Sequence, residues 1–199
     1  MKNFEFWFDF GSPSAYLAWT QIPNVEADTG AVAIYKPMLL GGVFQATGNH
    51  SPVTIVSKGT YTFIDFARYA KRYAVPLNMN PYFPINTLLL MRIAIGLQSA
   101  GASPFKDYCR TVFNAIWVDA LNMNDPATVG KALQQAGFDV DDLLTLANSQ
   151  VTKDALKAAT QTAVERGIFG APTFFVGDEM FWGQDRLDFV TEALQRAPS

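Results

Sequence analysis

The hydrophobic pattern at the start of the chain predicts a strand, a helix and a second strand. Residues 3–9 and 32–38 are short runs rich in aromatic and apolar residues, which is typical of strands. Between them, apolar residues recur at helical spacing over 13–28, and Thr29-Gly30 ends that helix. These residues therefore predict a right-handed β-α-β unit with a parallel pair of strands.

Helical patterns occupy the middle of the chain. Apolar positions recur at helical spacing from Ser57 to Tyr73, and a proline-rich loop follows at 80–84. Residues 86–100 are largely apolar, which predicts a helix that is buried on most sides. Further helices are predicted over 104–117, 126–136, 139–147 and 150–167. The first two of these follow pairs that suit an N-cap and a first helical position, Ser103-Pro104 and Asp125-Pro126.

The pattern changes again near the end of the chain. Residues 171–182 predict two strands joined by a Gly177-Asp178 turn, and 185–196 predict a closing helix. A β-α-β part and a β-β-α part, joined through helices, is the layout of an α/β thioredoxin-like fold with a large all-helical insertion. We expect segments 1–42 and 168–199 to form the thioredoxin-like domain, and 43–167 to form the inserted helical domain.

Composition narrows the classes of function. The chain has 199 residues, 49% of them hydrophobic and 17% charged, with 15 basic and 18 acidic residues and a net charge of −3. The absence of a basic patch argues against nucleic acid as a partner. The longest apolar run, 88–97, is interrupted by Arg92, and the chain enters its first strand at once. We therefore expect no membrane span, no secretory signal and a cytoplasmic enzyme.

The rare residues argue against a metal or disulfide site. One cysteine, Cys109, excludes an intramolecular disulfide and a cysteine-based zinc site, and the sequence favours a small buried role for it. One histidine, His50, excludes a site with several histidines. His50 suits proton transfer near neutral pH, but a loop histidine without a role is the favoured interpretation.

Ser12 is the first candidate for chemistry. It follows the first predicted strand at the N-cap position of the next helix, and Pro13 takes the first helical position. A hydroxyl at the positive end of a helix dipole, beside unpaired backbone donors, suits a phosphate or a thiolate. Because no Cys-x-x-Cys accompanies Ser12, a thiol at this site has to come from another molecule.

Three motifs carry a resemblance to a known family. They are Phe8-Asp9-Phe10-Gly11-Ser12-Pro13, Phe169-Gly170-Ala171-Pro172-Thr173-Phe174 and Trp182-Gly183-Gln184-Asp185-Arg186-Leu187. In this order and spacing, and without Cys-x-x-Cys, the chain resembles the 2-hydroxychromene-2-carboxylate isomerases. That family is related to kappa-class glutathione transferases within the DsbA-like branch of the thioredoxin superfamily. The resemblance covers almost the whole chain.

The resemblance implies a glutathione-dependent isomerase of bacterial naphthalene and polycyclic aromatic breakdown. Such an enzyme interconverts 2-hydroxychromene-2-carboxylate and trans-o-hydroxybenzylidenepyruvate. Rotation about a conjugated C=C bond is slow, so a thiolate adds, the resulting single bond turns, and the thiolate leaves. Glutathione is then regenerated in each turnover, and no metal is implied. The resemblance and the aromatic surplus also favour a homodimer.

The resemblance assigns roles to single residues. Ser12 is expected to hydrogen-bond the glutathione sulfur and favour its thiolate. Ala171 offers main-chain atoms to the cysteinyl unit, and Pro172, in a cis bond, sets their geometry. Gln184 and Asp185 are expected to contact the γ-glutamyl end of glutathione. Asn49 and Lys58 are expected to approach the thiol and the glycyl carboxylate of glutathione or the acid group of the substrate. The competing structural interpretations are that Ser12 and Asp185 are ordinary helix N-caps and that Lys58 is a solvated loop residue.

Some assignments stay open at this stage. Aromatic residues at 44, 82, 83, 117 and 182 either line a pocket for a flat substrate or pack in the core, and Arg186 is interpreted as a structural ion-pairing residue. A kappa-type glutathione transferase would use the same thiolate but release a conjugate. A non-catalytic thioredoxin-like protein that binds glutathione or a peptide is the alternative from another class.

Overall fold

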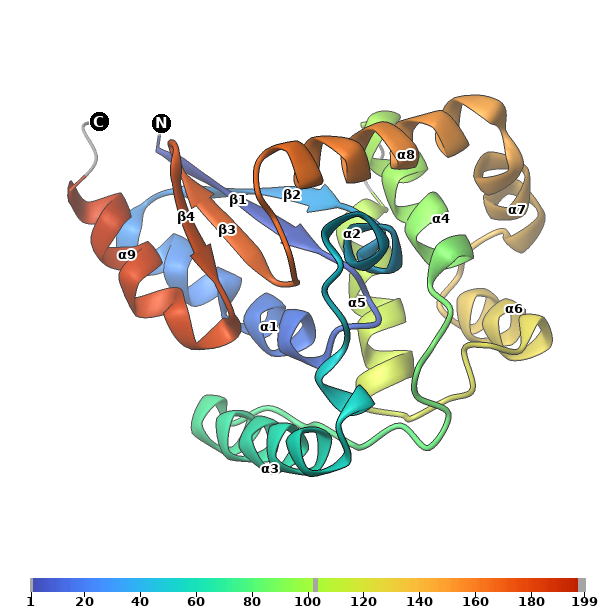
Figure 1. Cartoon of the computed structure of the whole chain (residues 1–199). Coiled ribbons are helices and arrows are strands. Elements are labelled where there is room, and N and C mark those ends of the chain that lie inside the picture. Colours follow the sequence, from blue (N-terminus) through green and yellow to red (C-terminus); the bar gives the residue numbers. More distant parts are fainter. Residues whose placement is uncertain (1, 102–103, 197–199) are drawn as a thin grey trace.

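A mixed four-stranded sheet lies at one side of the molecule (Figure 1). The computed structural model describes residues 2–101 and 104–196. The strands are β1 (Asn3–Phe8), β2 (Val32–Pro37), β3 (Thr173–Val176) and β4 (Glu179–Trp182), in the order β2-β1-β3-β4. β1 pairs in parallel with β2 and antiparallel with β3, and β4 is antiparallel to β3. The predicted β-α-β unit and C-terminal hairpin are confirmed.

Helices cover both faces of this sheet. On one face, α1 (Pro13–Thr29) and α9 (Leu187–Arg196) contact each other, and α9 follows a short 3-10 turn, η2 (Gln184–Arg186). On the other face, residues at the C-terminal end of α8 (Gln150–Glu165) and just beyond it pack against Trp7 and Phe175. The guanidinium of Arg166 lies 3.6 Å from the centre of the Phe175 ring.

The segment between β2 and β3 is helical, as predicted. Besides α8 it contains α2 (Leu40–Thr47), η1 (Pro52–Thr54), α3 (Val56–Tyr73), α4 (Leu88–Ser99), α5 (Phe105–Trp117), α6 (Pro126–Gln135) and α7 (Val140–Asn148). The helix α2 was not predicted, because Gly41 and Gly42 lower its helix propensity. Asp125 is the predicted cap of α6, whereas Ser103 lies outside the described residues.

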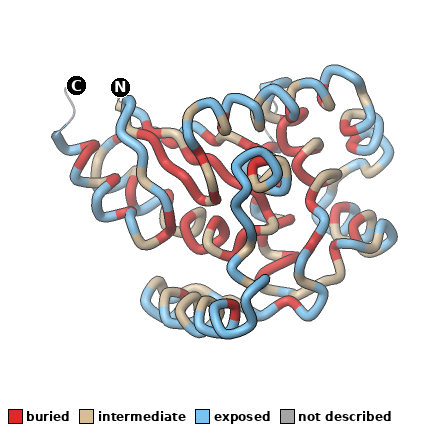
Figure 2. Tube along the Cα trace, viewed as in Figure 1, coloured by how far each residue is buried: buried red, intermediate tan, exposed pale blue. Residues whose placement is uncertain are grey.

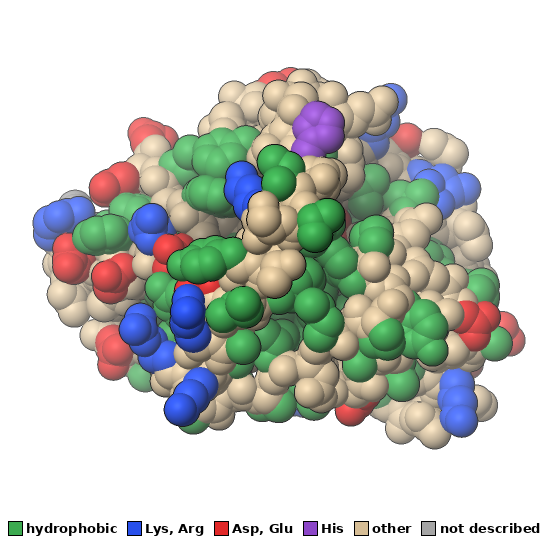
Figure 3. All heavy atoms as spheres, turned by 60° about the horizontal axis from the view of Figure 1, so that its bottom comes forward, with side chains coloured by type: hydrophobic (Ala, Val, Ile, Leu, Met, Phe, Trp, Pro, Cys, Tyr) green, Lys and Arg blue, Asp and Glu red, His purple; other side chains and the backbone are tan. Residues whose placement is uncertain are grey.

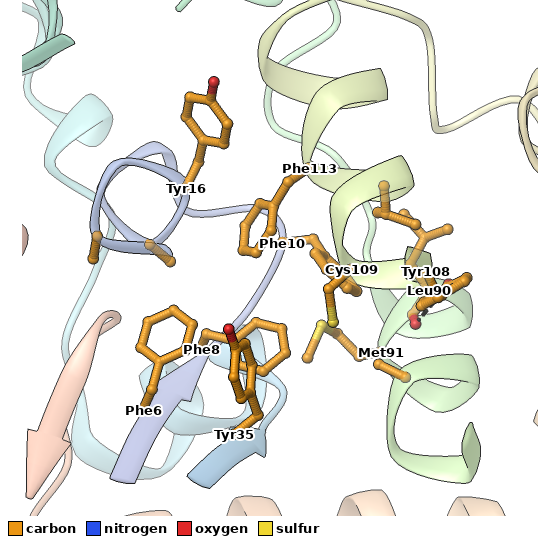
Figure 4. Packing of buried hydrophobic residues seen from close by; sticks show 14 of the residues in the cluster. Phe6, Phe8, Phe10, Tyr16, Tyr35, Leu90, Met91, Tyr108, Cys109 and Phe113 are labelled. Atoms are coloured by element: carbon orange, nitrogen blue, oxygen red, sulfur yellow. Dashed lines mark hydrogen bonds between the residues drawn. The ribbon is translucent and has the colours of Figure 1, made fainter. Parts of the chain in front are cut away.

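The core joins the sheet to the helical segment and contains many aromatic side chains (Figures 2 and 4). Phe6 and Phe8 stack with ring centres 5.1 Å apart, and Phe10 meets Phe113 of α5 edge-on at 4.8 Å. The helix α4 is buried on most sides, as its apolar sequence predicted. The predicted burial of Cys109 is also confirmed, and burial raises the pKa of its thiol. None of the helices within the described residues is long and apolar enough to cross a membrane.

Candidate active site

Ser12 caps α1 and contacts a loop that is distant in sequence. Its Oγ accepts a hydrogen bond from the backbone N–H of Ala15 at 3.1 Å, as an N-cap side chain does. The same hydroxyl donates to the carbonyl oxygen of Ala171 at 2.8 Å. Ser12 is buried, with 6% of its surface exposed. The contact therefore joins the start of α1 directly to the loop before β3.

The loop before β3 contains a cis proline and is hydrogen-bonded to two other segments of the chain. The Ala171-Pro172 peptide bond is cis. The carbonyl of Pro172 accepts from the Gly183 N–H at 3.0 Å, which ties this loop to the end of β4. Asn49 reaches the same loop, since its side-chain amide donates to the Phe169 carbonyl at 2.8 Å. Ser12, Asn49, Ala171 and Pro172 thus meet around one loop.

Gln184 and Asp185 lie at the start of the C-terminal helical segment, close to α1. The Ser14 hydroxyl donates to the side-chain carbonyl of Gln184, and the Tyr73 hydroxyl donates to its backbone carbonyl at 2.8 Å. Asp185 forms an ion pair with its neighbour Arg186, so the ion-pairing interpretation of Arg186 is confirmed. At Gly183, φ is +108° and a Cβ would come within 2.4 Å of the Asp185 carboxylate, so this close approach requires glycine.

Lys58 is set apart from this cluster. Its side chain is exposed on the first turn of α3, and its ammonium makes no hydrogen bond or ion pair to another residue in the described part of the chain. His50 is exposed in the loop after α2, where its backbone N–H donates to the Asn49 side chain at 2.8 Å. The structure therefore places Lys58 and His50 at the surface, without contacts to Ser12.

An open cavity of about 600 Å³ lies beside the start of α1, between α3 and the loop after it. Its lining consists of apolar side chains and a few polar ones, without Lys, Arg or His: Pro13, Val53, Val56, Gly59, Thr60, Phe63, Ile64, Ala67, Leu77, Asn78, Met79 and Trp117. Apolar side chains gather on the face of the molecule that carries α3 (Figure 3). Of the five aromatic positions proposed from the sequence, only Trp117 lines this cavity.

Trp117 also supports the loop that carries Ser12. Its indole N–H donates to the Phe10 carbonyl at 2.8 Å, and its ring is fully buried. The residue thus contacts both the cavity and the segment before Ser12. Nothing in the local sequence around Trp117 indicates this bond, because Trp117 and Phe10 are 107 positions apart.

Asp9 is the second residue whose role was missed. It is 2% exposed, and its carboxylate accepts from the backbone N–H groups of Gly11 and Leu40 at 2.8 Å each and from the Thr87 hydroxyl at 2.7 Å. Burial raises the pKa of the Asp9 carboxyl, and the three hydrogen bonds act in the opposite direction. An Asp just before a Gly-Ser-Pro turn was a usable signal, since acidic residues are seldom buried without partners.

The comparisons with known proteins identify the family. Residues 4–195 match the DSBA-like thioredoxin domain. A 2-hydroxychromene-2-carboxylate isomerase of Sphingobium xenophagum is 31% identical over 195 residues, covering 97% of this chain and 98% of the relative. The chain belongs to the 2-hydroxychromene-2-carboxylate isomerase family.

Two further comparisons place this family among its neighbours. The solved structure of a selenomethionine 2-hydroxychromene-2-carboxylate isomerase superimposes with a TM-score of 0.84, at 30% identity, over 98% of this chain and 95% of that one. The glutathione S-transferase kappa 1 of Caenorhabditis elegans is a more distant relative, 23% identical over 98% of this chain and 92% of its own length. The DsbA-like thioredoxin fold and the kinship with kappa transferases, both expected from the motifs, are confirmed.

Proposed function

We propose that this chain is a glutathione-dependent isomerase that interconverts 2-hydroxychromene-2-carboxylate and trans-o-hydroxybenzylidenepyruvate. The observation that carries the proposal is the contact between the Ser12 hydroxyl and the Ala171 carbonyl, next to a cis proline. It places a proton donor at a helix N-terminus beside an edge that suits an extended peptide. The family of the chain, with isomerase relatives 31% identical to it, supports the same reaction.

The residues around Ser12 fit a peptide thiol. When bound, glutathione would supply a thiolate that adds to the conjugated C=C bond of the substrate and leaves after the bond has turned. The N-terminus of α1 favours a negative charge at this position. Pro13 has no N–H, and no hydrogen bond occupies the Ser14 amide within the described residues, so this amide is open to an anion.

The hydroxyl of Ser12 has to change partners in this proposal. Its proton is directed at the Ala171 carbonyl. An incoming peptide N–H would donate to that carbonyl and leave the Ser12 hydroxyl to donate to the sulfur. The backbone N–H of Ala15 keeps the Ser12 oxygen in place during this exchange. The Ser12 hydroxyl would therefore become available to the sulfur only when the peptide is correctly bound.

Gln184, Asp185, Asn49 and Lys58 complete the proposed glutathione site. The Asp185 carboxylate would take the ammonium of the γ-glutamyl end, in place of part of its interaction with Arg186. Gln184 is held by hydrogen bonds to its side chain and its backbone, so its own position is fixed. The Asn49 side chain holds the loop beside Ala171 through its hydrogen bond to the Phe169 carbonyl. The exposed ammonium of Lys58 is available for an acid group of glutathione or of the substrate.

The cavity beside Pro13 is the proposed site for the aromatic part of the substrate. Its apolar lining suits a flat hydrocarbon ring, and it adjoins the residue that follows Ser12. Within the described part of the chain, the lining contains no Lys, Arg or His that could pair with a substrate carboxylate. This also favours the second candidate function, a kappa-type transferase, because such a cavity would accept a neutral electrophile as well as the anionic substrate. The two functions differ in whether glutathione is consumed.

We further propose the setting in which the enzyme works. It would act as a cytoplasmic homodimer in bacterial breakdown of naphthalene and related aromatics. Exposed apolar residues near the start of α3, Ile55, Val56 and Tyr61, support pairing with a second copy. The division into a thioredoxin-like domain (1–42 and 168–199) and an inserted helical domain (43–167) also stays a prediction.

The test is to follow trans-o-hydroxybenzylidenepyruvate by its absorbance, with enzyme alone and with enzyme plus glutathione, while free thiol is measured in parallel. The proposal predicts equilibration to the chromene only with glutathione, and full recovery of thiol. Loss of thiol with formation of a conjugate would assign a transferase. No reaction in either assay would leave a thioredoxin-like binding protein.

A further inference from the structure

The Asp9 carboxylate is hydrogen-bonded to the turn that carries Ser12 and to residues at the starts of α2 and α4. One carboxylate oxygen, Oδ1, accepts from the Gly11 N–H and from the Thr87 hydroxyl at the start of α4. The other, Oδ2, accepts from the N–H of Leu40, the first residue of α2. One side chain therefore fixes the catalytic turn against two helices of the middle segment.

The three hydrogen bonds of Asp9 suit an ionised carboxylate. Two of the three partners are N–H groups, and every partner donates. An ionised carboxylate satisfies all three as an acceptor, whereas burial acts in the opposite direction and raises the pKa of this carboxyl. The backbone N–H of Leu40, at the start of α2, favours a negative charge at this carboxylate. A buried carboxyl group is costly unless it is hydrogen-bonded, and Asp9 meets this requirement through three partners on three segments of the chain.

Asp9 and Trp117 also hold the backbone of this turn. The Ser12 N–H donates to the Asp9 carbonyl at 3.1 Å, and the Phe10 carbonyl accepts from Trp117. At Gly11, a Cβ would lie 3.2 Å from the Thr87 methyl, so the turn has little room to shift toward α4. The residues that hold Asp9 therefore help to set the position of the Ser12 Oγ, together with its own bonds to Ala15 and Ala171.

We propose that Asp9 is a positioning residue of the Ser12 site, which holds the Ser12 hydroxyl at the place where a thiolate binds. This inference rests on the proposed function and adds a residue to which that function assigns no role. Small displacements of a reacting group lower rates far more than they lower stability, and a shift of about 1 Å can reduce a rate about a hundredfold. A substitution of Asp9 should therefore lower kcat without a matching change in the affinity for glutathione.

The principal test replaces Asp9 by asparagine, which keeps the shape but turns one acceptor into a donor. The amide would face the Leu40 N–H, so that bond is lost and the turn is released from α2. We expect Asp9→Asn to lower kcat at least about tenfold, with the KM for glutathione within about twofold of the wild type. Asp107→Asn, an exposed carboxylate on α5, is the matched control and should leave both constants unchanged.

A second readout does not depend on the substrate. The ultraviolet absorbance of the thiolate, titrated with pH in the glutathione complex, reports the pKa of the bound thiol. We expect that pKa to rise in Asp9→Asn, because the misplaced Ser12 hydroxyl no longer stabilises the thiolate. If the wild type fails to isomerise the substrate, the proposed function fails, yet this titration still tests the role of Asp9.

A matched pair at Thr87 separates positioning from folding. Thr87→Val removes only the hydroxyl that donates to Asp9, and Thr87→Ser keeps it. We expect a several-fold loss of kcat in the valine variant and near-normal kcat in the serine variant. If Asp9→Asn does not fold, the two Thr87 variants still test whether Asp9 positions Ser12. Unchanged kcat and thiol pKa in folded Asp9→Asn would overturn the proposal, as would equal losses in both Thr87 variants.

Discussion

The Ser12 hydroxyl donates to the Ala171 carbonyl at 2.8 Å across 159 positions of sequence. This bond joins the N-terminus of α1 to the cis-proline loop, the two parts of the fold that we propose contact glutathione together. It also occupies both groups to which the proposal assigns a bond with glutathione. The protein therefore holds its proposed proton donor and peptide acceptor against each other until a peptide separates them.

Replacement of Ser12 by alanine tests the proton donor. We expect Ser12→Ala to lower kcat at least about tenfold, since one well-placed donor to a developing anion is worth that much or more. Loss of the N-cap should lower the free energy of unfolding by about 1 kcal/mol. Ser149→Ala, which removes the N-cap of α8, is the matched control, and it should show a similar stability loss with unchanged kcat. Equal kcat in wild type and Ser12→Ala would remove Ser12 from the mechanism.

Asp185 is the test of the γ-glutamyl site. Asp185→Ala should raise the KM for glutathione about tenfold or more, because a charge-assisted hydrogen bond to the ammonium is lost. The kcat at saturating glutathione should change little. Glu192→Ala, an exposed carboxylate of α9, should alter neither constant. Unchanged affinity in Asp185→Ala would show that the γ-glutamyl end binds elsewhere.

The apolar cavity gives a prediction about the substrate alone. Ala67 lines it from α3, so Ala67→Trp should fill part of the 600 Å³ and raise the KM for the aromatic substrate. The KM for glutathione should not change, because Ala67 is not among the residues proposed to hold glutathione. Steady-state kinetics with each ligand varied separately make this measurement. Gln134→Trp on α6 controls for an added indole on an exposed helix, and equal effects of the two would place the substrate outside the cavity.

Buried tyrosines predict a loss of stability in alkali. Burial raises the pKa of Tyr16 to about 12, and its hydroxyl donates to the Pro76 carbonyl at 2.7 Å. In the unfolded chain the same group ionises near pH 10, so the unfolded state binds fewer protons between these values. The stabilisation is fully present below about pH 10 and is lost as pH rises toward 12.

Denaturant melts across this range check the prediction. Tyr16→Phe should be less stable than the wild type at neutral pH, because the bond to Pro76 is lost. Its stability should then fall less between pH 10 and 12. Tyr82→Phe, an exposed tyrosine in the loop between α3 and α4, should follow the wild-type curve. A wild-type curve that stays flat up to pH 12 would contradict the assignment.

The sequence predicted those parts of the fold that depend on local signals. The β-α-β start, the apolar α4, the Asp125 cap of α6 and the hairpin turn at Gly177 all follow from spacing or from the preferences of single residues. The position of Ser12 as an N-cap followed by proline is equally local. The family resemblance then added the cis bond before Pro172, which the structure contains.

The parts that were missed depend on partners distant in sequence. The helix α2 begins at Leu40 without a side-chain cap of its own, and the first N–H of this helix is satisfied by Asp9, 31 positions earlier. The tie between Trp117 and Phe10 spans 107 positions. Spacing rules reach only a few residues along the chain, so neither bond was predictable from local pattern. The same limit explains why the Ser12 to Ala171 contact emerged only from the structure.

A crystal structure of the glutathione complex is the most direct test of the account. We expect the sulfur within hydrogen-bonding distance of the Ser12 Oγ, and the cysteinyl N–H donating to the Ala171 carbonyl in place of Ser12. The γ-glutamyl ammonium should lie against Asp185. A complex in which Ser12 still donates to Ala171 while the sulfur lies elsewhere would contradict the proposed activation of the thiol.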